Sequence, residues 1–183
     1  MDHQVVTLLD HFSESEKTGS NLLVVVHPSH IGDYSAMGQC FTMGASNKKI
    51  CKAKFYLQKI GSPVGHLKAA LYAVTGSCGT NGRPTGDPLA LSDSVTMESV
   101  GTDYVLVEFI FTGDEKYEMQ ASTTYCIECL VSDATLLDLD NCINVGIADE
   151  EPTHNGNWSG YIESSWNFTD GTDTIFYVYG EAV

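Results

Sequence analysis

Short runs of alternating apolar and polar residues, separated by glycine, proline, asparagine and aspartate, constrain the fold of this chain more than any other feature. The clearest run covers residues 51–58, and its apolar side chains are Cys51, Ala53, Phe55 and Leu57. A period of two places successive side chains on opposite faces of a β-strand. A turn at residues 61–65 and a second run at residues 67–73 then complete a predicted β-hairpin.

Further runs of the same kind predict strands at residues 104–111, 121–131, 141–148 and 174–179. The first of these is apolar on both faces, which favours a central position with its second face under a loop or a partner. Residues 75–88 are rich in Gly, Thr, Asn and Pro and are expected to form a long surface loop.

A helical period is nearly missing from the sequence. The best helical face runs through residues 5–12, but the same residues suit a first strand, which we prefer. Many short strands without a long amphipathic helix predict an all-β sandwich or barrel.

The chain has 183 residues, which fits one domain, and its formal net charge of −15 comes from 24 acids and 9 bases. Such a surface repels phosphate, so we expect neither nucleic acid nor an anionic membrane as a partner. The apolar run at residues 22–26 is too short to span a bilayer and follows no basic segment, so a secretory signal is not expected. Six lysines gather in residues 48–68, which either orients the domain on an acidic partner or forms a solvated strand face balanced by acids.

The six cysteines are Cys40, Cys51, Cys78, Cys126, Cys129 and Cys142. Cys126 and Cys129 have the C-x-x-C spacing of zinc and redox sites. They lie, however, in a predicted strand, where residues three apart point to opposite faces and cannot converge on one ion. We therefore expect no metal at this pair, and the sequence leaves buried free thiols and one or two disulfides open.

No catalytic signature is found in the sequence, neither G-x-S-x-G nor H-E-x-x-H nor a phosphate-binding glycine loop. His27 and His30 could form a two-histidine metal site or be ordinary loop histidines. The acids at Asp138, Asp140 and residues 149–151 could hold a structural Ca²⁺, or lie together because the chain is so acidic. Nothing selects a carboxylate pair for glycoside hydrolysis. We expect no catalytic residue, no cofactor and no enzyme activity.

The most unusual segment, residues 152–161, places aromatic rings in a polar, glycine-rich loop. Exposed rings can stack on the C–H face of a sugar while amides and histidine contact its hydroxyls. The candidate glycan-binding residues are His154, Asn157, Trp158, Tyr161 and Trp166. The alternative is that Trp158 and Trp166 fold back and cap one end of the sandwich.

Several segments resemble a group of jelly-roll-like β-sandwich domains found in phage and prophage virion proteins, in tail-associated or capsid-decorating components, and in some bacterial surface proteins. The similarity covers roughly residues 36–180, and its motifs lie at residues 38–42, 55–65, 71–73, 84–90, 125–126, 144–146, 152–157 and 176–180. The resemblance implies a jelly-roll-like antiparallel β-sandwich. It carries over no catalytic residue, and the cysteines depart from the pattern, so no pairing is implied.

These observations favour a virion structural protein, either a capsid decoration or a tail-associated component, made in the host cytoplasm. Residues 1–35 would form an arm and first strands that dock on neighbours or complete the sandwich of residues 36–183. We expect the chain to be complete from Met1, with capsid or tail proteins as partners and a homo-oligomer such as a trimer as its state. The alternative is an adhesion module that binds host glycans, and a polysaccharide-degrading enzyme is the least supported reading.

Overall fold

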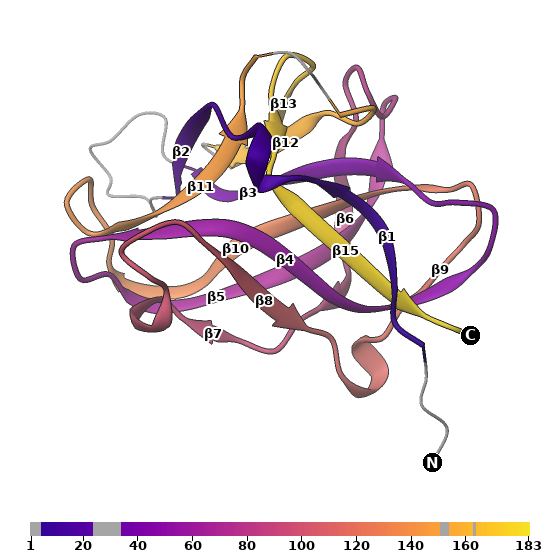
Figure 1. Cartoon of the computed structure of the whole chain (residues 1–183), viewed down its shortest axis with the longest axis horizontal. Helices are drawn as coiled ribbons and strands as arrows, with labels where there is room; N and C mark the ends of the chain where they lie inside the picture. The colour runs from indigo at the N-terminus through magenta and orange to yellow at the C-terminus, as the bar shows by residue number, and fades with distance from the viewer. Residues whose placement is uncertain (1–4, 24–33, 151–153, 163) are drawn as a thin grey trace.

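The computed structural model describes residues 5–23, 34–150, 154–162 and 164–183. They form two antiparallel β-sheets that pack face to face, as the sequence predicts (Figure 1). The two sheets are linked by one parallel bridge among the described residues, in which Leu23 pairs with Tyr34. Apart from three short 3₁₀ turns, Glu14–Glu16, Met97–Ser99 and Gly113–Glu115, the described residues contain no helix.

The first sheet contains both ends of the described chain. Its strands are β1 (Thr7–Phe12), β15 (Phe176–Glu181), β4 (Lys48–Ile60), β11 (Cys142–Ala148) and β2 (Gly19–Leu23), with β8 (Val105–Ile110), β9 (Glu118–Met119) and β14 (Asp173–Thr174) beside them. The N-terminal strands β1 and β2 thus pair with β15 and β11 and belong to this sheet.

The second sheet is built around three long neighbouring strands. In spatial order it contains β13 (Ser165–Thr169), β12 (Trp158–Ile162), β3 (Tyr34–Thr42), β10 (Thr124–Leu136), β5 (Val64–Thr75), and then β6 (Arg83–Leu91) and β7 (Val95–Thr96). The two runs of the predicted hairpin are confirmed as the strands β4 and β5. The hairpin itself is wrong, because β4 pairs with β15, β11, β8 and β9, whereas β5 pairs with β10, β6 and β7 in the other sheet.

The main core lies between the two sheets. In β4, Ala53, Phe55 and Leu57 are fully buried and alternate with half-exposed residues, which confirms the period read from the sequence. Phe41 of β3 and Phe176 of β15 meet across the interface with ring centroids 6.4 Å apart. Burying one such ring stabilises the fold by about 2 kcal/mol, so the core supplies most of the cohesion.

Two expectations about single elements are wrong. β8 pairs only with β4 within the described residues, so residues 105–110 form an edge strand and not a central one. Residues 83–88, part of the surface loop expected at residues 75–88, belong instead to β6, which pairs with β5. By contrast, residues 7–12 form the strand that we preferred to a helix.

The second sheet curls so that its two ends meet on the face turned away from the main core. There β12 and β13 contact β6, and the Arg83 guanidinium of β6 lies 5.4 Å from the ring centre of Phe168 in β13. A second, smaller apolar cluster fills the curl, and its buried members are Cys40, Ala70, Tyr72 and Cys126.

Strand β10 separates the two interiors. Tyr125, Ile127 and Cys129 point into the main core, whereas Cys126 and Leu130 belong to the small cluster. The two cysteines of the C-x-x-C pair therefore lie in different interiors, as the strand geometry predicts, and they cannot share one metal ion.

Candidate functional site

An open groove of about 320 Å³ lies at the mouth of the curled second sheet. Aromatic and apolar side chains from β5, β10, β12 and β13 line it, and β6 supplies its polar rim through Asp87. Its lining residues include Ser35, Tyr72, Asp87, Pro88, Tyr161 and Trp166. Ligand sites are typically concave and apolar with a few polar groups, and this groove fits that description.

Trp166 sits between two tyrosines. Its ring centroid lies 5.4 Å from that of Tyr72 at an interplanar angle of 67°, and 5.1 Å from that of Tyr161 at 64°. Edge-to-face packing of this kind is a favoured aromatic geometry and holds the rings in place. The groove therefore presents a rigid aromatic wall.

The local sequence explains why these rings meet. Tyr161 and Trp166 are directly opposite each other in the β12–β13 hairpin, so both side chains project from the same face. The reversal between the strands includes Ser164, whose φ of 66° lies in the left-handed region. Tyr72 reaches the same place from β5 because the sheet curls.

Burial, together with the charges of Glu128 and Asp87, raises the pKa of Tyr72 to about 12. Its phenol is therefore protonated at neutral pH and can both donate and accept a hydrogen bond. The exposed Asp87 carboxylate on the rim can accept hydrogen bonds from a ligand.

Of the five predicted glycan-binding residues, Tyr161 and Trp166 line the groove and three lie elsewhere. Trp158 is only 4% exposed and packs in the main core. Trp158 and Tyr161 are three positions apart on β12. Because side chains alternate along a strand, their rings point to opposite faces. The alternative that Trp158 folds back into the sandwich therefore describes its position.

Asn157 is fully buried and acts as a structural fastener. Its Oδ1 accepts hydrogen bonds from the backbone N–H groups of Gly79, at 2.9 Å, and Gly82, at 3.2 Å. Its Nδ2 donates to the carbonyls of Gly82, at 2.8 Å, and Trp158, at 2.9 Å. The amide is fully occupied and has no capacity left for a sugar hydroxyl.

His154 is also engaged within the protein. Its Nδ1 accepts a hydrogen bond from the Gly156 N–H at 2.9 Å, and its Nε2 lies 3.0 Å from Asp10 Oδ1. An acceptor at Nδ1 places the proton of the neutral ring on Nε2, which then donates to Asp10. Both nitrogens have partners, so the residue anchors residues 154–156 against β1.

The acidic clusters make backbone and side-chain hydrogen bonds of their own. Asp138 Oδ1 accepts from the Asp140 N–H at 2.9 Å and from Asn141 Nδ2 at 3.0 Å, which closes a tight turn. Asp149 pairs with Thr18. No group of three or more His, Cys, Asp or Glu side chains within the described residues is arranged to hold a metal ion. His27, His30 and Glu151 lie outside those residues.

Glu128, which sequence reasoning does not single out, lies in β10 beneath the groove and is completely buried. Ser159 Oγ donates to its Oε1, and its Oε2 has no hydrogen-bond partner among the described residues. Burial raises its pKa well above the ordinary value, which favours the neutral form of the acid. In the sequence, Glu128 lies between Cys126 and Cys129 and looks like an exposed polar residue of an alternating strand. It is buried only because the second sheet curls over it.

Gly38 makes room for this acid. A Cβ added there would lie 1.9 Å from the Ile127 carbonyl oxygen and 2.7 Å from Glu128 Oε2. No side chain fits in that space, so glycine is required at the start of the motif at residues 38–42. The residue has a structural role and does not contact the groove.

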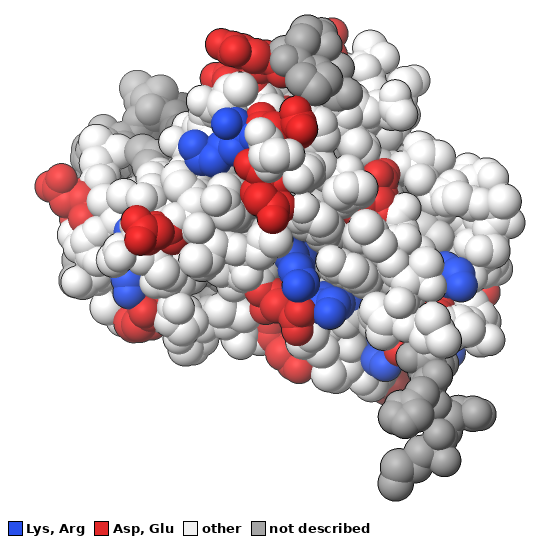
Figure 2. Space-filling model, in the orientation of Figure 1, with Lys and Arg blue, Asp and Glu red and all other residues white. Residues whose placement is uncertain are grey.

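The lysines of β4 are balanced by neighbouring groups. Lys52 and Lys54 approach Glu108 Oε2 at 3.1 and 3.4 Å, and both ammonium groups lie near the Tyr179 ring. Figure 2 shows acidic and basic side chains scattered over this face among many uncharged residues, without a broad basic patch. This arrangement fits the solvated strand face that the sequence offered as an alternative.

No protein-family model matches the chain, and a search of curated proteins gave no match. Within the described residues, no helix is long and apolar enough to cross a bilayer.

Proposed function

We propose that this chain is a non-catalytic binding protein that holds a carbohydrate in the groove at the mouth of the curled sheet. The observation that carries the proposal is the aromatic wall of Tyr72, Tyr161 and Trp166 beside the carboxylate of Asp87. An aromatic ring stacks on the apolar C–H face of a sugar, and a carboxylate accepts hydrogen bonds from its hydroxyls.

The charge of the chain narrows the ligand class. The net charge of −15 and the rim position of Asp87 repel sulfated, phosphorylated or sialylated glycans. Neutral sugars are therefore the expected ligands. Binding at one shallow groove is weak, and display of many copies on a particle would strengthen it by avidity.

Binding without hydrolysis fits the residues that line the groove. Glycoside hydrolysis uses two carboxylates on either side of the scissile bond. The described lining residues contribute one, that of Asp87, while Glu128 is buried below them and contacts Ser159.

The test is a neutral-glycan array followed by titration calorimetry with the best ligand. Trp166→Ala should weaken binding about tenfold or more, because it removes the ring that contacts both tyrosines. Tyr179→Ala is the matched control, since it removes a half-exposed ring from the first sheet and should leave affinity unchanged. Equal affinity of Trp166→Ala and the unsubstituted protein would contradict the proposal. Trp158→Ala is unsuitable, because it opens the main core.

A second candidate function is that of a virion structural protein, either a capsid decoration or a tail-associated component. The observation that favours it is the apolar exposure on both edge strands of the first sheet, where Leu8 of β1 is 41% and Ile110 of β8 is 37% exposed (Figure 1). Beside them a hollow of about 250 Å³ is lined by Val6, Ile110 and Phe111. Interfaces between subunits of an obligate oligomer typically cover apolar side chains of this kind.

We propose that a second copy of the chain covers the apolar surface formed by Leu8, Ile110 and the hollow beside them. Light scattering on the purified protein should then show an oligomer, and Ile110→Asp should convert it into a monomer with an unchanged circular dichroism spectrum. Val64→Asp is the control, because Val64 is similarly exposed but lies on the second sheet. A monomeric unsubstituted protein at high concentration would exclude self-association through this edge.

A further inference from the structure

Three of the six thiols gather at one end of the small cluster in the curled sheet. The Cys40 side chain, on β3, lies beside Cys126, on β10, and close to Cys78, in the turn before β6. Cys40 and Cys126 are fully buried, whereas Cys78 is partly exposed. None of the three is used by the groove.

Cys40 and Cys126 are cross-strand neighbours. They are directly opposite in the β3–β10 register, and the Cys40 N–H points away from β10, to the Asn157 carbonyl at 2.9 Å. The pair is therefore of the non-hydrogen-bonded type, in which Cα atoms are about 4.5 Å apart. A disulfide spans Cα separations of about 4.4–6.8 Å, so this pair lies at the short limit.

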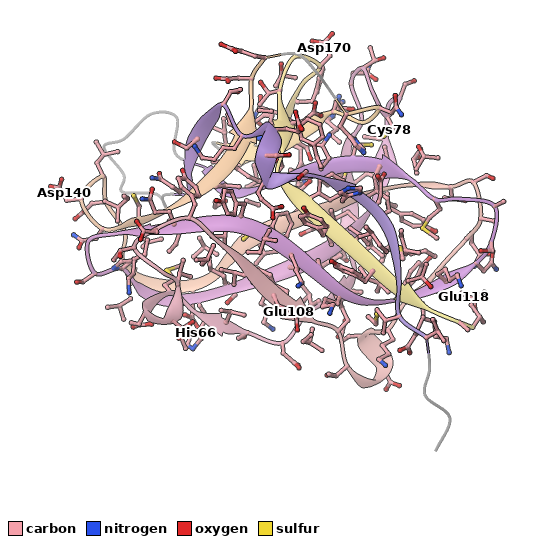
Figure 3. The ribbon with its side chains drawn as sticks, in the orientation of Figure 1. His66, Cys78, Glu108, Glu118, Asp140 and Asp170 are labelled. Carbon is pink, nitrogen blue, oxygen red and sulfur yellow. The ribbon has the colours of Figure 1, made fainter. Side chains whose placement is uncertain are left out.

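Cys78 approaches Cys40 from a different element. It belongs to the turn at residues 77–82, which Asn157 fastens through Gly79 and Gly82. A Cβ added at Gly82 would lie 2.8 Å from Cys40 Sγ and 3.0 Å from Cys78 Cα, so the glycine leaves the space in which the two thiols meet. Figure 3 labels Cys78 near the surface at the upper end of the molecule. A turn can adjust its backbone to the geometry of a disulfide more easily than two paired strands.

We propose that Cys78 is an oxidation site and that it forms a reversible disulfide with Cys40 when hydrogen peroxide reaches the turn. In the first step the Cys78 sulfur attacks one peroxide oxygen, the O–O bond breaks, and the products are a sulfenic acid and water. In the second step the Cys40 sulfur attacks the sulfenic sulfur, the S–O bond breaks, and a second water leaves. Two sulfurs lose one electron each in total, and the peroxide is reduced to two waters.

Exposure selects the first partner, and proximity selects the second. Of the three thiols only Cys78 is accessible to solvent, so the oxidant meets it first. Cys126 is set one further step away, behind Cys40. Cys51, Cys129 and Cys142 are buried elsewhere, and Cys129 and Cys142 belong to the main core.

The rate of oxidation should depend on pH. The pKa of Cys78 is raised by the neighbouring Cys40 thiol and by burial, with a smaller contribution from the charge of Asp10. The Cys40 pKa is raised by Cys126, burial and Glu128, against an opposing effect of Cys78. Because the thiolate is the nucleophile, oxidation is slow at neutral pH and speeds up about tenfold per pH unit.

The disulfide would tie the turn at residues 77–82 to β3 and close the end of the small cluster. It would cross-link positions 38 residues apart in the sequence, and loops of that size give disulfides a substantial stabilising effect. The melting temperature of the full chain should rise by about 10 °C on oxidation and return on reduction. The inference holds whether or not the groove binds carbohydrate.

The experiment is peroxide treatment of the reduced full-length protein, followed by intact-mass measurement and peptide mapping without reduction. The mass should fall by two hydrogen atoms, and a Cys40–Cys78 linked peptide should appear. Cys78→Ser should abolish the mass change. Cys126→Ala is the matched control, and it should retain the linked peptide.

Three results would overturn the proposal. These are a Cys40–Cys126 link in the unsubstituted protein, a disulfide that persists in Cys78→Ser, and sulfinic acid at Cys78 without any disulfide. Should Cys126→Ala fail to fold, the peptide map of the unsubstituted protein decides by itself, because it identifies the linked pair.

Discussion

Single residues in the second sheet show how one buried acid imposes conditions on its neighbours. Glu128 needs Ser159 as a hydrogen-bond donor and Gly38 as empty space. The curled sheet removes its carboxyl from water, which raises the pKa and favours the protonated form. A group of this kind makes stability depend on pH.

Replacement of the acid by its amide should reveal that dependence. A carboxyl whose pKa is raised in the folded state stabilises fully below its ordinary value of 4.5, and that contribution is lost as pH rises towards the raised pKa. Relative to Glu128→Gln, the unsubstituted protein should therefore lose about 1.4 kcal/mol of unfolding free energy per pH unit. Denaturant titrations of both proteins at pH 5, 6 and 7 measure the difference, and a difference that does not change with pH would contradict the assignment.

At the scale of elements, the segment at residues 154–157 joins parts of the fold that are distant in sequence. The His154 ring contacts Asp10 of β1, and the backbone N–H of His154 donates to Asp173 Oδ2 at 2.8 Å. Asn157 holds the turn that leads into β6. Residues singled out as ligand-binding candidates by their polarity therefore connect β1, β14 and β6.

Asn157→Ala should destabilise the protein by about 2–4 kcal/mol, because it leaves buried backbone groups of Gly79, Gly82 and Trp158 without their partner. The exposed neighbour Asn155 provides a matched control, and Asn155→Ala should change stability by less than about 0.5 kcal/mol. Urea unfolding gives both values. Similar losses for the two variants would show that Asn157 is not a fastener.

The sequence predicts where the strands lie better than it predicts which strands pair with one another. Alternation in residues 51–58 gives β4 and its buried face, and the same rule separates Cys126 from Cys129. It cannot reveal that β8 is an edge strand, because an apolar run looks alike at an edge and at a centre. It also misses β6, whose Gly and Pro residues suit a strand that needs few ladder bonds.

The candidate site was only partly accessible to sequence reasoning. Tyr161 and Trp166 were found because aromatic rings in a polar segment are unusual. The sequence suggests a loop at Trp158, which leaves the direction of its ring open, whereas on β12 the ring points to the main core and away from Tyr161. Tyr72 and Asp87 could not be assigned, since they join the groove only through the curl of the sheet.

For the whole molecule the dominant property is its acidity. The net charge of −15 makes the folded surface repel itself, and dissolved salt screens that repulsion. Attraction is local, as at Glu108 of β8, whose carboxylate pairs with both Lys52 and Lys54 (Figure 3 labels Glu108).

Sodium chloride should therefore raise the melting temperature by about 2–4 °C, which corresponds to roughly 1 kcal/mol of relieved repulsion. Differential scanning calorimetry in low and high salt measures this effect. Calcium and magnesium chloride at equal ionic strength provide the control, and they should act alike. A larger rise in calcium alone would indicate a specific Ca²⁺ site, for example at Asp138 and Asp140, and would contradict simple screening.

The role of β10 as a wall between two interiors has a consequence for how such a protein can vary over generations. Side chains on the two faces of β10 have different roles. Ile127 and Cys129 pack in the main core, whereas Leu130 faces the groove side. A substitution of Leu130, which lines the groove, could change what the surface recognises while the side chains that face the main core stay in place. An insertion of one residue in that strand would exchange the two sets and damage both at once.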